Sequence, residues 1–224
     1  MDSSNVAGIA SVAVVAGIGV LGLFVLLFVI IVVANRAEPD PRGLRPLSVY
    51  LFSMSFVMLQ ITYAGAALIA ASLISLVGPH FSPLTNGIAR SVVIGGLLIV
   101  IAGSTLVFHV RKGIDVAGGD GGVDGPNVRI LNTYVSVVSF LYLFTMLVAL
   151  GFSIYLIFEL VGPGVFGGGS TGRTVIVENL LDTVYVLVAS GIILIIHSRF
   201  GAPSIFRFKD QGSPGISAKH IAPE

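Results

Sequence analysis

Long apolar stretches alternate with short polar segments along this chain. The apolar stretches cover about 8–34, 47–77, 91–109, 131–161 and 179–197. A bilayer whose hydrocarbon core is about 30 Å thick needs roughly 20 consecutive apolar residues in each helix that crosses it. Every stretch is close to this length or longer. The pattern therefore predicts an all-α integral membrane protein with five transmembrane helices.

The first stretch has one alternative interpretation, the apolar part of a cleaved signal peptide. The residues before it carry no basic side chain, and 8–34 is far longer than the roughly 7–15 apolar residues of a signal peptide. We therefore expect a retained helix. Its small residues would let a second helix approach closely. These residues are Ala13, Gly17, Gly19 and Gly22.

Composition agrees with a membrane protein. Hydrophobic residues make up 55% of the 224 residues and charged residues 10%, whereas about 25% of the residues of a soluble domain are charged. The formal net charge of +1 provides no overall field that would attract nucleic acid. The chain has no cysteine, which excludes a disulfide framework, thiolate zinc sites and iron–sulfur clusters.

The basic residues are distributed unequally between the two ends of the predicted helices. Ten follow the first, third or fifth stretch, and two follow the second or fourth. Cytoplasmic segments are enriched in Lys and Arg, so we expect the N-terminus outside and the C-terminus in the cytoplasm. The ten are Arg36, Arg42, Arg45, Arg111, Lys112, Arg129, Arg199, Arg207, Lys209 and Lys219, and the two are Arg90 and Arg173.

The last four stretches carry the signature of a duplicated pair. A shift of 84 residues places Arg45 on Arg129 and Tyr50 on Tyr134, and the same Leu-Val-Gly-Pro run ends both stretches. A shift of 88 residues then aligns the next helices, through the pattern His-x-Arg-x-Gly. The matched residues there are His109, Arg111 and Gly113 with His197, Arg199 and Gly201.

These matches divide the chain into five segments. Because both hairpins enter from the cytoplasmic side and return to it, they would be parallel repeats related by an axis along the membrane normal. We expect a pseudo-two-fold four-helix bundle with the first helix on its flank. The segments are an N-terminal helix and linker (1–44), hairpin repeat 1 (45–113), a Gly-rich cytoplasmic linker (114–128), hairpin repeat 2 (129–201) and a cytoplasmic tail (202–224).

Each hairpin resembles a bacterial membrane family, the domain-of-unknown-function family numbered 5671. Its repeated two-helix unit begins with an Arg near a Tyr and ends in a His-Trp-type signature. The matching residues are Arg45, Tyr50 and His109 in one hairpin and Arg129, Tyr134 and His197 in the other, although Val110 and Ser198 stand where the signature has Trp. The resemblance implies a bacterial cytoplasmic (inner) membrane and assigns no activity.

The symmetry should bring Arg45, His109, Arg129 and His197 to one level of the bundle, and three roles are open for this level. The arginines, together with Arg111 and Arg199, would anchor the helix ends on lipid phosphates. The histidines would bond Tyr50, Tyr134 or the opposite repeat in a polar network. Alternatively, His109 and His197 would be the axial ligands of a b-type haem.

No motif for catalysis is present, since the chain has no Walker loop, HExxH or strand-associated GxGxxG sequence. We expect no enzymatic activity, and no cofactor unless haem is bound.

The expected partners are the lipid bilayer and other membrane-protein subunits. The chain would be a structural or accessory subunit of a larger bacterial complex, respiratory or photosynthetic. The alternatives are a haem-binding electron-transfer subunit and a small-solute transporter. A transporter needs polar residues near the midplane, for which the chain offers Gln60, Thr62 and Thr145.

Overall fold

The computed structural model describes residues 22, 25, 29, 40, 43–77, 86–118, 126–162, 165 and 172–205. These residues form an all-helical structure, and no strand occurs among them. The helices are α2 (Arg45–Val77), α3 (Asn86–Gly118), α4 (Pro126–Val161) and α5 (Arg173–Ile205). All four are long and apolar enough to cross a membrane.

The helices extend beyond the apolar stretches at several ends. α3 begins at Asn86 and continues to Gly118, whereas its apolar stretch covers 91–109. Hydropathy marks where a helix can face lipid, but backbone hydrogen bonds continue through polar residues at its ends. The predicted first helix lies outside the described residues, apart from three helical positions, Gly22, Val25 and Val29.

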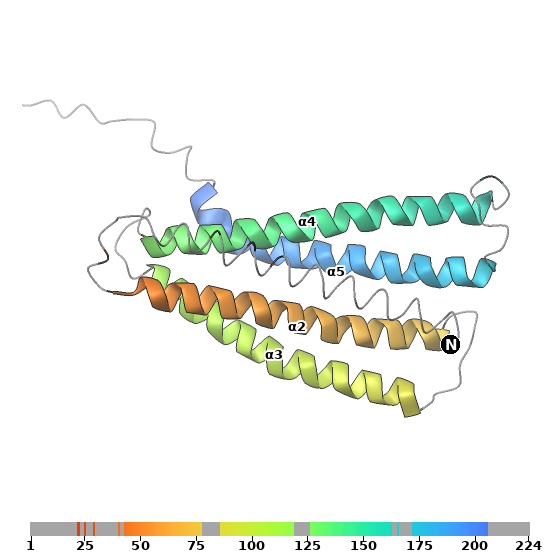
Figure 1. The fold of residues 1–224 in the computed structure, drawn as a ribbon, viewed down its shortest axis with the longest axis horizontal. Coiled ribbons are helices and arrows are strands. Elements are labelled where there is room, and N and C mark those ends of the chain that lie inside the picture. The colour runs from red at the N-terminus through yellow and green to blue at the C-terminus, as the bar shows by residue number, and fades with distance from the viewer. Residues whose placement is uncertain are drawn as a thin grey trace, which may run out of the picture.

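The four helices are paired as two antiparallel hairpins (Figure 1). α2 packs along α3, and α4 packs along α5. The hairpins meet through contacts of similar extent between α2 and α4, between α2 and α5, and between α3 and α4. Within the described chain, α3 and α5 do not pack on each other. The starts of α2 and α4 and the ends of α3 and α5 therefore share one end of the bundle, which we call the basic end.

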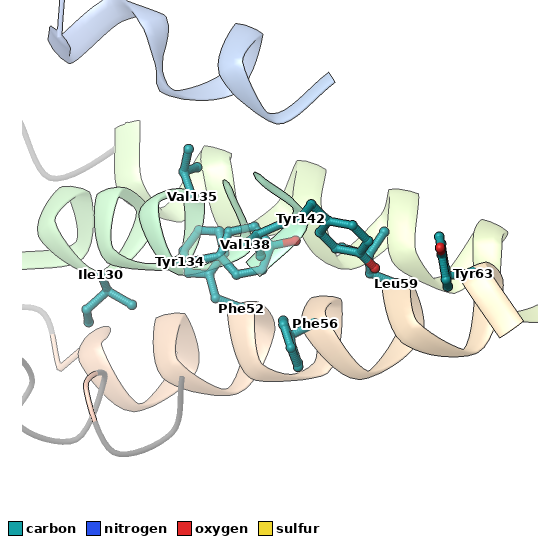
Figure 2. Close-up of a cluster of buried hydrophobic side chains, with 9 residues drawn as sticks. All are labelled: Phe52, Phe56, Leu59, Tyr63, Ile130, Tyr134, Val135, Val138 and Tyr142. Carbon is teal, nitrogen blue, oxygen red and sulfur yellow. The ribbon is translucent and has the colours of Figure 1, made fainter. Parts of the chain in front are cut away.

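The hydrophobic core lies between α2 and α4. Its side chains come from one face of each of these helices, and α3 and α5 contribute residues at its margins. Large apolar side chains on the outer faces are exposed, as expected for helices surrounded by lipid. The core residues, shown in Figure 2, are Phe52, Phe56, Leu59, Tyr63, Ile130, Tyr134, Val135, Val138 and Tyr142.

Glycines allow two close approaches to α2. A Cβ atom added at Gly95 would lie 2.6 Å from the Gly65 carbonyl oxygen, so α2 and α3 touch there through their backbones. A Cβ atom at Gly22 would lie 2.7 Å from Leu141 Cδ1 and 3.1 Å from Phe56 Cζ. Gly22 therefore lies against both α4 and α2. Small residues let membrane helices pack at such short range.

The glycine contact in the first hairpin leads to a matched test. Gly95→Leu is expected to lower the stability of the purified protein by about 1–3 kcal/mol, because the new side chain meets backbone that has no room to move. Gly96 has no atom within 4 Å of an added Cβ, so Gly96→Leu should have little effect. Thermal unfolding in detergent measures both variants. Equal losses of stability in the two variants would contradict the close contact.

Candidate functional site

His197, near the basic end of α5, is held by two contacts. Its Nδ1 lies 3.0 Å from the Ile193 carbonyl oxygen, one helical turn earlier. Because a carbonyl can only accept, Nδ1 carries the proton and Nε2 is left with a lone pair. The hydroxyl of Tyr134 on α4 lies 3.2 Å from Nε2 and donates to it. Both residues are buried, with Tyr134 1% exposed and His197 5% exposed, so this bond joins α4 and α5 inside the protein.

The first hairpin contains a related but looser pair. His109 Nδ1 lies 2.8 Å from the Thr105 carbonyl oxygen, as in the other hairpin. The ring centroids of Tyr50 and His109 are 5.8 Å apart, the same separation as for Tyr134 and His197. Tyr50, however, is 55% exposed. Both hairpins thus place a tyrosine against the histidine, and a buried hydrogen bond forms between the second pair.

Matched positions on α2 and α4 differ in burial, and not always in the same direction. Phe56 is fully buried, whereas Phe140, 84 residues later, is 68% exposed. α2 and α4 each pack on the other three described helices, and both contact Gly22, so the identity of their neighbours does not account for this difference. By contrast, the order of buried, half-buried and exposed residues over 102–109 of α3 is the same as over 190–197 of α5. The outer helices are therefore more alike than the two central ones.

The Tyr134 ring connects the second hairpin to the first. Its centroid lies 5.2 Å from that of Phe52 on α2, and the two rings overlap in Figure 2. A Cβ atom added at Gly113 on α3 would lie 2.8 Å from the Phe52 ring, so the backbone of α3 is in close contact with that ring. Gly113, Phe52, Tyr134 and His197 thus form a continuous row of contacts through all four described helices. We call this row the Tyr134 layer.

Polar contacts fix the helix starts at the same end. The Ser48 hydroxyl donates to the Asn127 side-chain oxygen at 2.7 Å, and both residues are fully buried between α2 and α4. The Asp40 carboxylate accepts hydrogen bonds from the backbone N–H groups of Leu44 and Arg45 and so caps the start of α2. Gly43, at φ 63°, supplies the left-handed turn before this helix.

The residues singled out from the sequence lie at this end of the bundle. Arg45 and Arg129 are half-buried where α2 and α4 begin, and Arg111 and Arg199 are exposed toward the ends of α3 and α5. Their role as lipid anchors stays a prediction. The two histidines lie on α3 and α5, which do not pack on each other.

The geometry is not arranged for haem. A haem iron would bind the Nε2 lone pair of His197, which the Tyr134 hydroxyl already occupies. The Phe52 and Tyr134 rings also lie against each other in the layer between the two outer helices. Among the described residues, no group of three or more His, Asp or Glu side chains could hold a metal ion.

A second polar group, in which Gln60 is the one residue expected above to supply midplane polarity, lies near the middle of the spans. Tyr63 on α2 has its ring centroid 5.7 Å from Tyr142 on α4 and 6.5 Å from Tyr185 on α5. Ser190 on α5 lies beside Tyr63, and Gln60 lies beside Tyr142. Within the described chain, none of the three tyrosine hydroxyls or the Ser190 hydroxyl has a partner at full hydrogen-bonding geometry. These five residues are the midplane cluster.

Residue type and spacing did not predict that these tyrosines meet. Tyrosine counts as hydrophobic in a span, and the three helices that bring these rings together are far apart in the chain. Thr62 and Thr145, expected to supply midplane polarity, instead donate to the carbonyl oxygens of Met58 and Leu141 in their own helices. A search for tyrosines near the centre of each apolar stretch would have found Tyr63, Tyr142 and Tyr185.

No family model matches the chain, and no similar curated protein or solved structure was found. The resemblance of the two hairpins to a bacterial membrane family therefore stays a prediction.

The Tyr134–His197 bond can be tested by removing one oxygen atom. Tyr134→Phe is expected to destabilise the protein by about 1 kcal/mol or more, because it removes the hydroxyl that donates to the buried Nε2 of His197. Tyr50→Phe removes a hydroxyl from an exposed ring and should be close to neutral. Thermal unfolding in detergent compares the two variants. If Tyr50→Phe costs as much as Tyr134→Phe, the assigned hydrogen bond is not the stabilising contact.

Proposed function

We propose that this chain is a non-catalytic multi-pass membrane protein that serves as a structural or accessory subunit of a larger membrane assembly. The observation that carries the proposal is the outer face of α4. Large side chains at helical spacing form a stripe there, on the side opposite the core, and are between 45% and 68% exposed. The stripe consists of Phe140, Phe144, Leu147, Tyr155 and Phe158.

A notch in this stripe favours a helix as its partner. Gly151 lies within the stripe, and no atom of the described residues lies within 4 Å of an added Cβ. Lipid chains can cover a continuous apolar face without any such feature. A glycine flanked by large side chains lets the backbone of another helix come close, which increases the van der Waals contact that drives helix association in membranes. The proposed occupant is an apolar transmembrane helix of another subunit.

The proposed topology is five helices, made of two parallel hairpin repeats and a flanking first helix, in a bacterial cytoplasmic membrane. The matching contacts of His109 and His197 support the duplication. The basic side chains of α2 to α5 support the orientation, since they concentrate at the end where α2 begins. This end would face the cytoplasm, with the N-terminus outside.

Loss of the notch should release the partner. After gentle solubilisation of native membranes, the chain is expected to migrate on native gels as part of a larger complex and to co-purify with defined subunits. Gly151→Leu fills the notch and should shift the chain to a smaller species, whereas Gly96→Leu, at another open glycine, should not. Migration of the unaltered chain as an isolated monomer would contradict the proposal.

The midplane cluster favours a second candidate function, passage of a small neutral solute. Transporters built from repeats bind their substrates near the bilayer midplane, where the repeats meet. Tyr63 belongs to the first hairpin, and Tyr142, Tyr185 and Ser190 belong to the second. Their hydroxyls can donate and accept hydrogen bonds but carry no charge, so they suit a hydroxyl-bearing or amide-bearing molecule better than an ion.

Flux into liposomes tests this second candidate. Liposomes that contain the protein are expected to take up glycerol faster than empty liposomes, and Tyr63→Phe with Tyr142→Phe should reduce this rate. The double variant should lose little stability, because within the described chain neither hydroxyl makes a hydrogen bond at full geometry. Tyr50→Phe, outside the cluster, is the control. Equal uptake by protein-containing and empty liposomes counts against passage of this solute class.

A further inference from the structure

The outer face of α3 carries a hollow close to the basic end. Its volume is about 320 Å³. Every described residue that lines it belongs to one face of α3, on the side opposite the packed residues Ala102, His109 and Gly113. The described part of its lining therefore faces away from the bundle. Its lining residues are Ser104, Val107, Phe108, Arg111, Lys112 and Asp115.

The length of the apolar span sets the depth of this hollow. Arg90 and Arg111 are 21 residues apart on α3, which corresponds to about 31 Å of helix. This length matches the roughly 30 Å hydrocarbon core, so Arg111 lies where lipid phosphates begin. Phe108 lies on the hydrocarbon side of that boundary. Asp115 lies about 6 Å farther out, one helical turn beyond Arg111.

Along α3, the apolar, cationic and anionic residues of the lining come in an order that matches the parts of one class of phospholipid. From the membrane outward, α3 presents the apolar Val107 and Phe108, then the cations Arg111 and Lys112, then the Asp115 carboxylate. A phospholipid with an ammonium headgroup presents acyl chain, phosphate and ammonium in the same order. All three charged side chains are exposed. We propose that this face binds a phospholipid with a primary ammonium headgroup, that is, phosphatidylethanolamine.

Headgroup chemistry distinguishes this lipid from its competitors. A primary ammonium has three N–H donors for the Asp115 carboxylate, as a lysine side chain has. The quaternary ammonium of phosphatidylcholine has none. Phosphatidylglycerol has no ammonium, so its headgroup offers the Asp115 carboxylate only neutral hydroxyl donors and adds a net negative charge. Arg111 and Lys112 contribute to binding all three lipids, whereas Asp115 provides the selectivity.

α5 supplies an internal control for this site. The positions 88 residues later than the lining residues are apolar apart from one arginine, and no carboxylate is among them. A generic contact between an arginine and lipid phosphate is therefore available on α5 without the selective element. The α5 residues are Ile192, Ile195, Ile196, Arg199, Phe200 and Pro203.

Native mass spectrometry of the full chain in detergent tests the proposal. The protein is titrated with phosphatidylethanolamine, phosphatidylcholine and phosphatidylglycerol that have identical acyl chains. Phosphatidylethanolamine is expected to bind most tightly. Asp115→Asn should abolish this preference but retain lipid binding. Arg111→Gln combined with Lys112→Gln should weaken binding of all three lipids, by about fivefold for exposed charge contacts.

Arg199→Gln is the matched control, and it should leave the preference and the affinity unchanged. Equal binding of phosphatidylcholine and phosphatidylethanolamine would overturn the assignment of the ammonium contact. A preference that survives Asp115→Asn would do the same. If Arg199→Gln weakens binding as much as the α3 double variant, the lipid contacts are generic. Thermal unfolding of each variant separates loss of lipid from loss of fold, since all the substituted side chains are exposed.

Discussion

The hydrogen bond from the Tyr134 hydroxyl to His197 Nε2 fixes the arrangement on which the packing at the basic end depends. A membrane interior offers no water to a polar group, so a buried imidazole needs partners within the protein. The Ile193 carbonyl oxygen accepts a hydrogen bond from Nδ1 of this ring, and the Tyr134 hydroxyl donates one to Nε2. With its hydroxyl held by α5, the Tyr134 ring packs on Phe52, which in turn lies against the backbone of α3 at Gly113.

The two hairpins use similar residues in different surroundings. Each ends with a histidine whose Nδ1 is bonded one turn back and whose ring meets a tyrosine. In the first hairpin the tyrosine is exposed, and in the second it belongs to the core. The core therefore forms where α2 and α4 meet, and the outer faces of α3 and α4 are left to lipid or to other proteins. The surfaces proposed for function lie on these two faces, apart from the midplane cluster.

The sequence predicted the four apolar spans that the structure describes, because these follow from residue type and spacing along the chain. A contact between tyrosine and histidine was one of three roles left open for the basic end. The sequence pattern placed the ends of α3 several residues too far inward, since polar residues such as Arg111 and Lys112 continue the helix beyond the hydrocarbon. The meeting of the midplane tyrosines was missed because Tyr63, Tyr142 and Tyr185 come from three helices, and their convergence depends on helix rotations that spacing alone does not set. The unequal burial of Phe56 and Phe140 was missed for the same reason.

A double-mutant cycle on Tyr134→Phe and His197→Ala, measured by unfolding of the protein in lipid or mild detergent, tests the central interaction most directly. The cycle isolates the energy that the two side chains contribute together, apart from the packing that each loses alone. A coupling of about 0.6 kcal/mol or more, the average for polar pairs between membrane helices, is the predicted result. Additive effects of the two substitutions would contradict the account.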